Sequence, residues 1–232
     1  MANKESPVDE IIRRLTVAMI TKNEEEAIGK VIENIKAFAP GVEILIVDSS
    51  SDQTPLIAER MGARVIRQFP PKGYGPAMEL ALRSSQREVV ITMDGDNTYP
   101  PERIIPFARM ILNEGYDLVN GCRLRGKPKN MPWSNYLGNF FFALLASILF
   151  GRRIRDLHSG MRAYRKSMID QLSFRAKGAA LPVELLLKPL TRGFRVAFVD
   201  IEYQNRIGIS KMNPLATSLW TLRRILSARF GR

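Results

Sequence analysis

The apolar run from Val89 to Met93 ends abruptly in two carboxylates, Asp94 and Asp96, which a single glycine separates. The run has the length and the β-branched content of a buried strand. The two carboxylates repel each other, and they follow the strand at the edge where open α/β sheets bind their ligands. A divalent cation, Mg²⁺ or Mn²⁺, held by this pair would relieve the repulsion. The alternative is a solvated acidic turn, because Asp and Gly are common turn residues.

The first half of the chain alternates strand-like and helix-like patterns. Short apolar runs predict strands, and apolar residues spaced three and four apart predict helices. The expected strands are 15–20, 42–47, 65–66, 89–93 and 118–119, and the expected helices are 25–38, 55–61, 77–84 and one that begins at 100–101. This order predicts an α/β fold with a mostly parallel central sheet and helices on both faces. The sequence contains neither a glycine-rich dinucleotide fingerprint nor a P-loop.

The second half of the chain is organised differently. Its patterns are, in order, an apolar and aromatic-rich helix 133–150, a basic run 151–155, a polar loop 156–162, a helix 182–190, a strand 194–203 and a basic loop 206–211. Asn213 and Pro214 then have the cap and first-turn preferences of a helix start. We therefore expect a lead-in over 1–14, one main domain over 15–211 with the helix 133–150 inserted, and an amphipathic C-terminal helix over 212–232.

The chain is strongly basic, with 35 lysines and arginines against 23 aspartates and glutamates. Basic chains favour nucleic acid, anionic lipid or phosphorylated ligands. Nucleic acid is the least favoured, because no recognised binding motif is present and the acidic strand ends would stay unexplained. The single cysteine, Cys122, fits a reducing compartment, and the absence of a Cys/His array argues against zinc. The first 14 residues are polar, so we expect no signal peptide, and the apolar run 137–150 is too short to span a bilayer.

Three motifs occur in order along the chain. They are Asp94-Gly95-Asp96, Asp156-x-x-Ser159-Gly160-x-Arg162 and Arg206-x-Gly208-x-Ser210-Lys211. This ordered set, over about residues 15–211, resembles the family-2 glycosyltransferases of GT-A fold, and within them the dolichol-phosphate mannose synthase-like enzymes. The resemblance implies inverting transfer of a sugar from a nucleotide diphosphate, of GDP-mannose or UDP-glucose type, to a polyprenyl or dolichyl phosphate.

The resemblance also implies a donor site at the ends of the first, second and central strands. The donor-binding residues that it implies are Asn23, Glu24, Asp48, Lys72, Asp94, Arg206 and Lys211. Asp96 is implied as the direct metal ligand and Asp94 as its partner, with Mg²⁺ or Mn²⁺ as the cofactor. The chain departs from the family pattern at Ile20, where relatives often have proline, and at Ser49, where they often have a second aspartate. These departures leave the identity of the base open.

The basic loop 206–211 suits the leaving group of such a sugar transfer. Breaking the sugar–phosphate bond releases a nucleoside diphosphate, and a divalent ion that bridges its phosphates stabilises it. Cationic side chains add to this effect, since charge develops on the leaving oxygen. Arg206 and Lys211 are the candidates, and with Asp96 and Asp156 they complete the predicted catalytic residues. The alternative for this loop is an ordinary solvated turn.

The acceptor determines what Asp156 must do. A hydroxyl nucleophile needs a general base, whereas a phosphate monoester, with a second pKa near ~6, is mostly dianionic at pH 7 and needs cationic positioning. Arg123 and Arg162 are candidate clamps, because guanidinium binds phosphate through two parallel hydrogen bonds. Ser159 is a further acceptor-binding candidate. Asp156 could then act as the base, orient the acceptor, or only hold an arginine in place.

Two helices favour a lipid acceptor. The helix 133–150 is followed by three arginines, and the helix 215–230 carries Trp220 and further arginines, so both suit a membrane interface. We therefore expect a peripheral protein on the cytosolic face of an anionic membrane. The alternative is a buried core helix and a C-terminal helix packed on the sheet. Rival functions are transfer to a soluble hydroxyl of a sugar, glycerate or glycan, nucleotidyl transfer, and sugar-nucleotide binding without catalysis.

Overall fold

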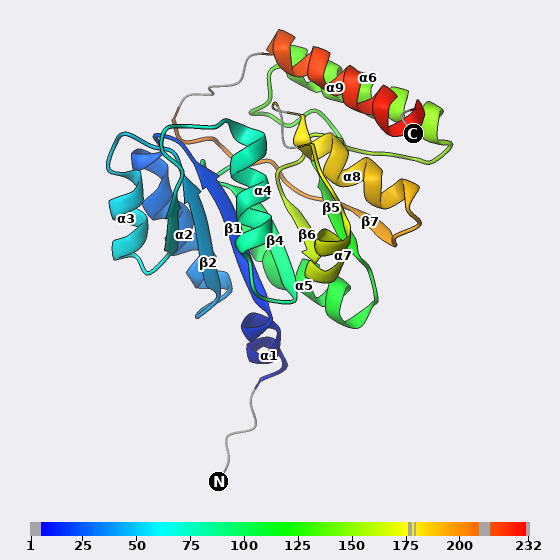
Figure 1. Ribbon diagram of the computed structural model, residues 1–232. Helices are drawn as coiled ribbons and strands as arrows, with labels where there is room; N and C mark the ends of the chain where they lie inside the picture. The colour runs from blue at the N-terminus through cyan, green and yellow to red at the C-terminus, as the bar shows by residue number, and fades with distance from the viewer. Residues whose placement is uncertain (1–5, 176–177, 179, 209–213, 231–232) are drawn as a thin grey trace.

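The computed structural model describes residues 6–175, 178, 180–208 and 214–230. In this part of the chain seven strands form one sheet in the order β3-β2-β1-β4-β6-β5-β7 (Figure 1). The strands are β1 Leu15–Thr21, β2 Glu43–Asp48, β3 Arg64–Arg67, β4 Val89–Asp94, β5 Leu118–Cys122, β6 Arg162–Arg165 and β7 Val196–Asp200. β6 runs antiparallel to its neighbours β4 and β5, and the other pairings are parallel. The mostly parallel sheet that the sequence predicts is therefore confirmed.

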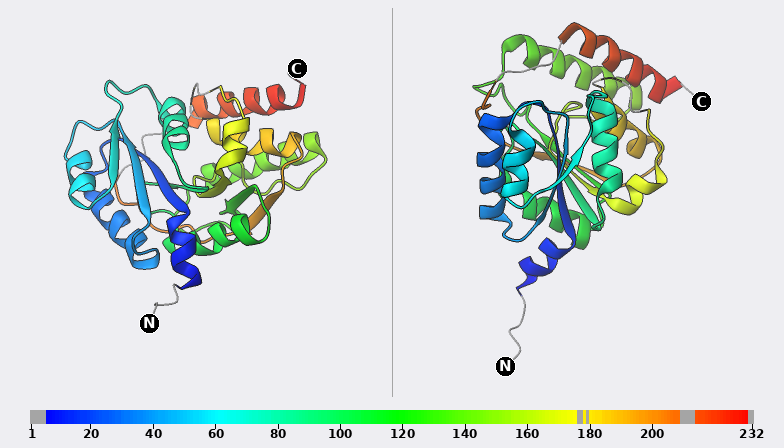
Figure 2. Two further views of the ribbon diagram at one scale, coloured as in Figure 1. Left: turned by 60° about the horizontal axis from the view of Figure 1, so that its bottom comes forward. Right: turned by 60° about the vertical axis from the view of Figure 1, so that its left-hand side comes forward.

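Helices cover both faces of the sheet, as predicted (Figures 1 and 2). They are α1 Pro7–Arg13, α2 Glu25–Phe38, α3 Thr54–Arg60, α4 Tyr74–Ser84, the 3₁₀ turn η1 Pro101–Arg103, α5 Ile104–Asn113, α6 Trp133–Phe150, α7 Lys166–Gln171, α8 Leu181–Thr191 and α9 Pro214–Phe230. In β1, Val17 and Met19 belong to the core that α2 and α5 close, and Ala18 belongs to the core that α4 and α8 close. Because successive strand residues point to opposite faces, each strand contributes to both cores.

The carboxyl ends of β1, β2 and β4 lie level at one edge of the sheet. The strand register pairs Thr21 of β1 with Asp48 of β2, and Ile20 of β1 with Asp94 of β4. Polar residues that are far apart in the sequence therefore meet at this edge, which is where parallel α/β sheets bind ligands.

The strand β6 was not expected from the sequence. Its four residues follow a polar loop and include two arginines, so no apolar alternation marks them. Arg162 is nevertheless buried, because its guanidinium donates to Asn120 Oδ1 at 2.6 Å and to the carbonyl oxygens of Pro182 and Leu157. Since β6 is antiparallel, it begins at the edge where β4 and β5 end, and the loop 156–161 reaches that edge too.

Some predicted boundaries were wrong. α4 begins at Tyr74 rather than at 77, inside a stretch that was expected to be a loop. Pro76 is accommodated because the first turn of a helix has backbone N–H groups without intrahelical partners. Gly73 precedes the helix with a φ of 95°, which a glycine adopts without strain. β7 is shorter than the predicted 194–203, and the helix α7 was not predicted.

α6 and α9 lie side by side at one end of the molecule (Figures 1 and 2). Nε of Arg229 in α9 donates to the carbonyl oxygen of Leu149 in α6 at 2.8 Å, and an ion pair between Arg224 and Glu184 ties α9 to α8. α6 has 18 residues and is, among the described residues, the one helix long and apolar enough to cross a membrane by length and composition alone. The run 137–150, which was expected to be too short to do so, therefore lies in a longer apolar helix.

Candidate active site

A cavity of about 750 Å³ opens at the carboxyl ends of β1 and β4 and extends to the facing sides of α6 and α9. The predicted site residues that line it are Glu24, Asp94, Asp96, Arg123 and Arg206. In the described part of the chain, the predicted residues that do not line it are Asn23, Asp48, Lys72, Asp156, Ser159 and Arg162. Lys211 lies outside the described residues. The structure thus brings both carboxylates of the acidic pair together with two arginines and one further acid.

The glycines Gly95 and Gly160 allow close packing around Asp94, which is itself partly exposed. A Cβ at Gly95 would meet Thr21 Cγ2 at 2.9 Å, and one at Gly160 would meet Asp94 Oδ1 at 2.8 Å. Both positions therefore require glycine for the loops to pass this close. Burial, followed by the charge of Asp96, raises the pKa of Asp94 to about 7. The pair is electrostatically unfavourable as it stands, as the sequence indicated.

The two carboxylate oxygens of Asp96 have different partners. Oδ1 accepts hydrogen bonds from the backbone N–H of Thr98 at 3.1 Å and from its hydroxyl at 2.6 Å. Oδ2 lies 2.8 Å from Nη1 of Arg206. One oxygen therefore fixes the turn, while the other is held by a side chain on the loop after β7.

The residues present fit a divalent cation that takes its other ligands from outside the protein. Asp94 and Asp96 are hard oxygen ligands, and the charge of Asp96 contributes to the raised pKa of Asp94. No cluster of three or more metal-binding side chains occurs among the described residues. Two carboxylates leave most positions of a Mg²⁺ or Mn²⁺ ion to water and to phosphate oxygens.

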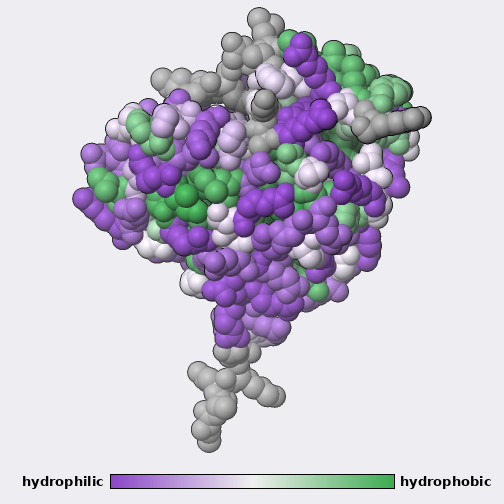
Figure 3. Space-filling view, in the orientation of Figure 1, coloured by the Kyte–Doolittle hydropathy of each residue, from purple (hydrophilic) through white to green (hydrophobic). Residues whose placement is uncertain are grey.

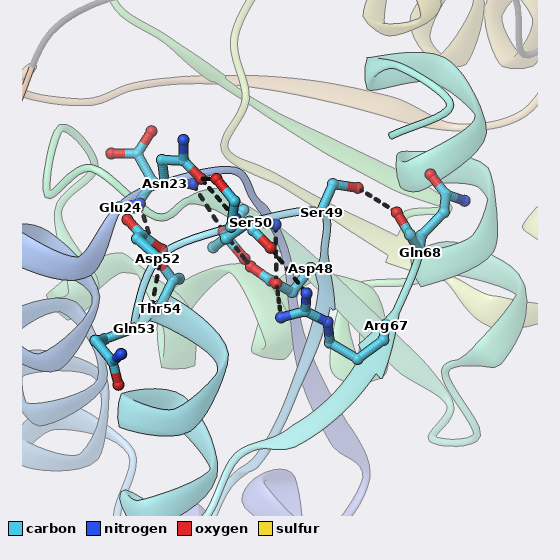
Figure 4. A network of polar contacts seen from close by, with 12 residues as sticks. Asn23, Glu24, Asp48, Ser49, Ser50, Asp52, Gln53, Thr54, Arg67 and Gln68 are labelled. Carbon is cyan, nitrogen blue, oxygen red and sulfur yellow. Dashed lines mark hydrogen bonds and ion pairs between the residues drawn. The ribbon is translucent and has the colours of Figure 1, made fainter. Parts of the chain in front are cut away.

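Asp48 is fully buried and is bound by neighbouring protein groups (Figure 4). Its carboxylate accepts hydrogen bonds from the Thr21 hydroxyl at 2.6 Å and the Ser50 hydroxyl at 2.6 Å. It also pairs with Nη1 of Arg67, at the end of β3, at 2.7 Å. Arg67 was not predicted as a site residue. Its position directly after the predicted third strand could have indicated it. Asp48 thus ties together the ends of three strands, and Ser49 beside it lines the cavity.

Asn23 and Glu24 connect the loop after β1 to the loop after β2 (Figure 4). The side-chain carbonyl of Asn23 accepts a hydrogen bond from the Ser51 N–H at 2.9 Å, and the Asn23 N–H donates to the Ser50 hydroxyl at 2.7 Å. The Glu24 N–H donates to the Thr54 hydroxyl at 2.8 Å. The carboxylate of Glu24 reaches the cavity, whereas Asn23 shapes its wall from behind.

Arg123 and Asp156 form a buried bidentate ion pair. Nε of Arg123 donates to Asp156 Oδ2 at 2.8 Å and Nη2 donates to Oδ1 at 3.0 Å. The backbone N–H groups of Arg123 and His158 also donate to this carboxylate. Burial alone would raise the pKa of Asp156, but the charge of Arg123 and these hydrogen bonds hold it below its usual value. Of the three roles left open for Asp156, the geometry supports the one in which it holds an arginine.

Arg162 and Ser159 are buried in the loop that carries Asp156 and at the start of β6. The guanidinium of Arg162 is used by three protein acceptors, and the Ser159 hydroxyl donates to the Met161 carbonyl at 3.4 Å. Both side chains stabilise the loop behind the cavity wall. Tyr99 supports the same loop, since its hydroxyl accepts a hydrogen bond from the Gly160 N–H at 2.6 Å.

Two titratable cavity residues were not predicted. Tyr74 opens α4, and burial, followed by the charge of Asp94, raises its pKa well above its usual value. His158 contacts Thr221 of α9, with 2.8 Å between Nε2 and the hydroxyl oxygen. Burial lowers the pKa of His158 to about 4, so its ring is neutral at pH 7. No local sequence pattern marks His158 as a cavity residue, because its neighbour on α9 is 63 positions away.

The far wall of the cavity is uncharged and rich in hydrogen-bonding groups. The polar side chains that α6 and α9 contribute to it are Ser134, Asn135, Asn139, Thr217, Ser218 and Thr221. Arg123 lines the same cavity, as does Arg206. The cavity therefore has an ionic half at the sheet and an uncharged half at the two helices, where Met131 and Phe142 line it beside the polar groups.

Comparison with known proteins gives a consistent result. The sequence model of the family described as glycosyl transferase family 2 matches residues 16–173. A dolichyl-phosphate hexose transferase from Haloferax volcanii is 44% identical over 203 residues, which cover 87% of this chain and 88% of the relative. A polyprenol monophosphomannose synthase from Mycolicibacterium smegmatis is 28% identical over 220 residues, which cover 87% and 82%.

A solved structure resembles the whole chain. It is the glucosyl-3-phosphoglycerate synthase of Mycobacterium tuberculosis in complex with Mn²⁺, uridine diphosphate and glucosyl-3-phosphoglycerate. The TM-score is 0.74 at 23% sequence identity, and the match covers 99% of this chain and 86% of the other. At this level of identity the likeness shows a shared fold.

Proposed function

Because the chain belongs to glycosyl transferase family 2 and has the GT-A fold, we propose that it moves a hexose from a nucleotide-diphosphate sugar to a polyprenyl phosphate. The names of two relatives, a dolichyl-phosphate hexose transferase and a polyprenol monophosphomannose synthase, support this acceptor. The donor is of GDP-mannose or UDP-glucose type, and the reaction is a single inverting displacement that depends on Mg²⁺ or Mn²⁺. The presence of Mn²⁺ and uridine diphosphate in the structural neighbour supports the metal and the donor class.

The ionic half of the cavity serves the donor in this proposal. Asp94 and Asp96 hold the cation, which neutralises the diphosphate as it leaves. Glu24 and Ser49 border the part of the cavity nearest β1 and β2, where the nucleoside fits. Arg206 supplies positive charge to the leaving oxygen. Lys211, which lies outside the described residues, is the second cation that the sequence motif proposes for this role.

One observation supports a phosphate acceptor over a hydroxyl acceptor. Within the described residues, the carboxylates that line the cavity are Glu24, Asp94 and Asp96, and all three belong to the donor half. Asp156 is engaged with Arg123 and has a lowered pKa, so it is a poor general base. A dianionic phosphate needs no base. What it needs is a fixed cation, and Asp156 presents Arg123 to the cavity as one.

A soluble hydroxyl acceptor is the second candidate. The uncharged wall of α6 and α9, with Asn135, Asn139 and Thr221, offers groups that suit sugar hydroxyls. The structural neighbour is named for a phosphoglycerate acceptor, which belongs to this same class of reaction.

A donor–acceptor assay tests the proposal. GDP- and UDP-hexoses are incubated with the protein and Mn²⁺ or Mg²⁺, with and without a short-chain polyprenyl phosphate, and release of the nucleoside diphosphate is measured. We expect lipid phosphate to stimulate release and a lipid-linked hexose to form, whereas the matching polyprenol without phosphate should have no effect. Stimulation by phosphoglycerate or a free sugar, and none by lipid phosphate, would establish the second candidate instead.

The outer faces of α6 and α9 support attachment to a membrane. The large apolar residues exposed on them are Trp133, Leu137, Phe140, Phe141, Leu144, Ile148, Leu219, Leu222, Leu226 and Phe230. Figure 3 shows hydrophobic side chains gathered over this end of the molecule. Exposed arginines at 152, 153 and 223 lie beside them. An apolar face with a basic border suits the interface of an anionic membrane, and we place the protein peripherally on the cytosolic face.

Removing two aromatic rings from this face should weaken membrane attachment. Phe140→Ser combined with Phe141→Ser is expected to lower partitioning onto vesicles by at least about tenfold, because each ring loses apolar burial in the bilayer. Flotation with vesicles of mixed neutral and anionic lipid at moderate salt measures this. Phe38→Ser combined with Leu56→Ser is the control, since these residues on α2 and α3 are similarly exposed. Failure of the unmodified protein to float would exclude the membrane proposal.

A further inference from the structure

The guanidinium of Arg206 lies between two carboxylates of the donor half. Its Nη1 atom is 2.8 Å from Asp96 Oδ2, and its Nη2 atom is 3.7 Å from Glu24 Oε1. Because Oδ1 of Asp96 is used by Thr98, Oδ2 is the oxygen that this turn leaves to other partners. Arg206 thus engages the ligand atom that a cation at the acidic pair would need.

The loop that carries Arg206 is docked on the acidic turn through its backbone. The Gln204 N–H donates to the Thr98 carbonyl at 2.9 Å, and the Ile207 N–H donates to the Asp96 carbonyl at 2.9 Å. Gly208 follows with a φ of 86°, a conformation that favours glycine. The backbone therefore holds the base of the Arg206 side chain close to the acids, and the guanidinium contacts Asp96 and Glu24.

The hydrogen bonding of Arg206 is incomplete in this position. Its Nε atom is buried and has no hydrogen-bond partner within the described residues. A buried N–H group without an acceptor is unfavourable, so the contact with the two acids does not satisfy the side chain fully. A diphosphate beside the acidic pair would offer several acceptor oxygens that a guanidinium can bind through two donors at once.

We propose that Arg206 is an exchangeable counter-ion of the donor site. Without a donor, its guanidinium neutralises Asp96 and Glu24. The divalent cation that arrives with a nucleoside diphosphate takes over Asp96 Oδ2, and the released guanidinium pairs with the diphosphate. The proposal rests on the metal-dependent donor site of the proposed function, and it is independent of the acceptor.

The exchange has a thermodynamic consequence. A divalent cation that arrives alone must displace a cation tethered within reach of the same oxygen, so it binds weakly. A cation that arrives with a diphosphate gives the displaced guanidinium a new partner, so the two bind cooperatively. Cooperativity of this kind is reciprocal between the two ligands.

Titration of Mn²⁺ tests the exchange without measuring turnover. Free Mn²⁺ is followed by electron paramagnetic resonance, with the protein alone and with saturating GDP or UDP. In the absence of nucleotide, Arg206→Gln is expected to bind Mn²⁺ at least about fivefold more tightly than the unmodified protein, an ordinary size for a coupling between sites. With nucleotide present, the variant should no longer bind Mn²⁺ more tightly than the unmodified protein. The coupling between Mn²⁺ and nucleotide is therefore smaller in the variant by at least the same factor.

Two further variants separate the exchange from a general change of charge. Arg14→Gln removes the same charge at the opposite end of the sheet, where Arg14 pairs with Glu88, and should leave Mn²⁺ binding unchanged. Arg206→Lys retains a competing cation, so it should bind Mn²⁺ alone less tightly than Arg206→Gln.

Mn²⁺ binding by Arg206→Gln that is no tighter than in the unmodified protein would overturn the proposal. That result would leave the acceptor assignment standing, because it concerns the donor half alone. Conversely, an enzyme that proved to use a soluble acceptor would still show the exchange at Arg206.

Discussion

Replacing Asp96 by asparagine is expected to lower the turnover number of sugar transfer by about 10³-fold, which corresponds to about 4 kcal/mol of lost transition-state stabilisation. Asp96 Oδ2 is the oxygen that contacts Arg206, and the amide that replaces the carboxylate carries no charge for a cation or for Arg206. The leaving diphosphate would then depart with less of its charge neutralised. Steady-state kinetics with saturating donor and acceptor measure the effect.

A control for this variant is available at the other end of the sheet. Asp117 precedes β5 and accepts a hydrogen bond from the Arg195 N–H at 2.9 Å, far from the cavity. Asp117→Asn removes the same charge and should keep turnover close to that of the unmodified protein. If Asp96→Asn were to retain turnover within about tenfold, the acidic pair could not be the metal anchor, because a metal ligand supplies a larger effect.

Asp156→Asn is expected to destabilise the folded protein by about 3–5 kcal/mol. The variant leaves the buried guanidinium of Arg123 without the carboxylate that binds it bidentately. A buried charge without its partner is far less favourable than the intact pair. Chemical denaturation of both proteins measures the difference. The KM for the phosphate acceptor should also rise more than the KM for the sugar donor, since Arg123 would lose its fixed orientation.

The destabilisation should not depend on pH between 5 and 8. The pKa of Asp156 is lowered in the folded state, so its stabilisation is fully present above the unfolded pKa and is lost only as the pH falls through the lower folded value. A gap between the two proteins that closed already near pH 6 would contradict an ionised carboxylate in this position.

A double variant separates stability from function. Arg123→Met combined with Asp156→Leu replaces the pair by apolar residues of similar volume, and such replacements are often neutral or stabilising. We expect it to recover most of the lost stability while transfer to lipid phosphate stays impaired. Full activity in the double variant would show that Arg123 has no part in acceptor binding.

The strand ends were predictable because their signal is local. An apolar run that stops at Asp94-Gly95-Asp96 marks both a buried strand and the edge at which it ends, and the structure places both there. β6 could not be found in this way, since its burial depends on Arg162 meeting acceptors on other segments. Sequence patterns detect the burial of apolar residues. They do not detect the burial of a charged side chain whose hydrogen-bond donors are all satisfied inside the protein.

The same limit applies to the protein partners of two other acids in the predicted site. Asp48 ends β2 and Asp156 stands in a polar loop at the predicted edge, and their residue type is the same as that of Asp96. Each of the two is paired with an arginine that is distant in the sequence. The arginine is 19 positions away from Asp48 and 33 positions away from Asp156. The identity of such a partner depends on strand order and loop path, which periodicity does not encode.

The ion pair between Arg123 and Asp156 joins the two ends of the long segment that contains α6. β5 ends at the catalytic edge, the chain leaves it to form α6, and it returns to the same edge to begin β6, with the ion pair joining the two flanks of the excursion. The sheet continues across this point as if the excursion were absent. The excursion therefore leaves and rejoins the sheet at one edge, and the ion pair fixes its two ends there. The position of α6 is set by these two ends and by its contact with α9, and not by any strand of its own.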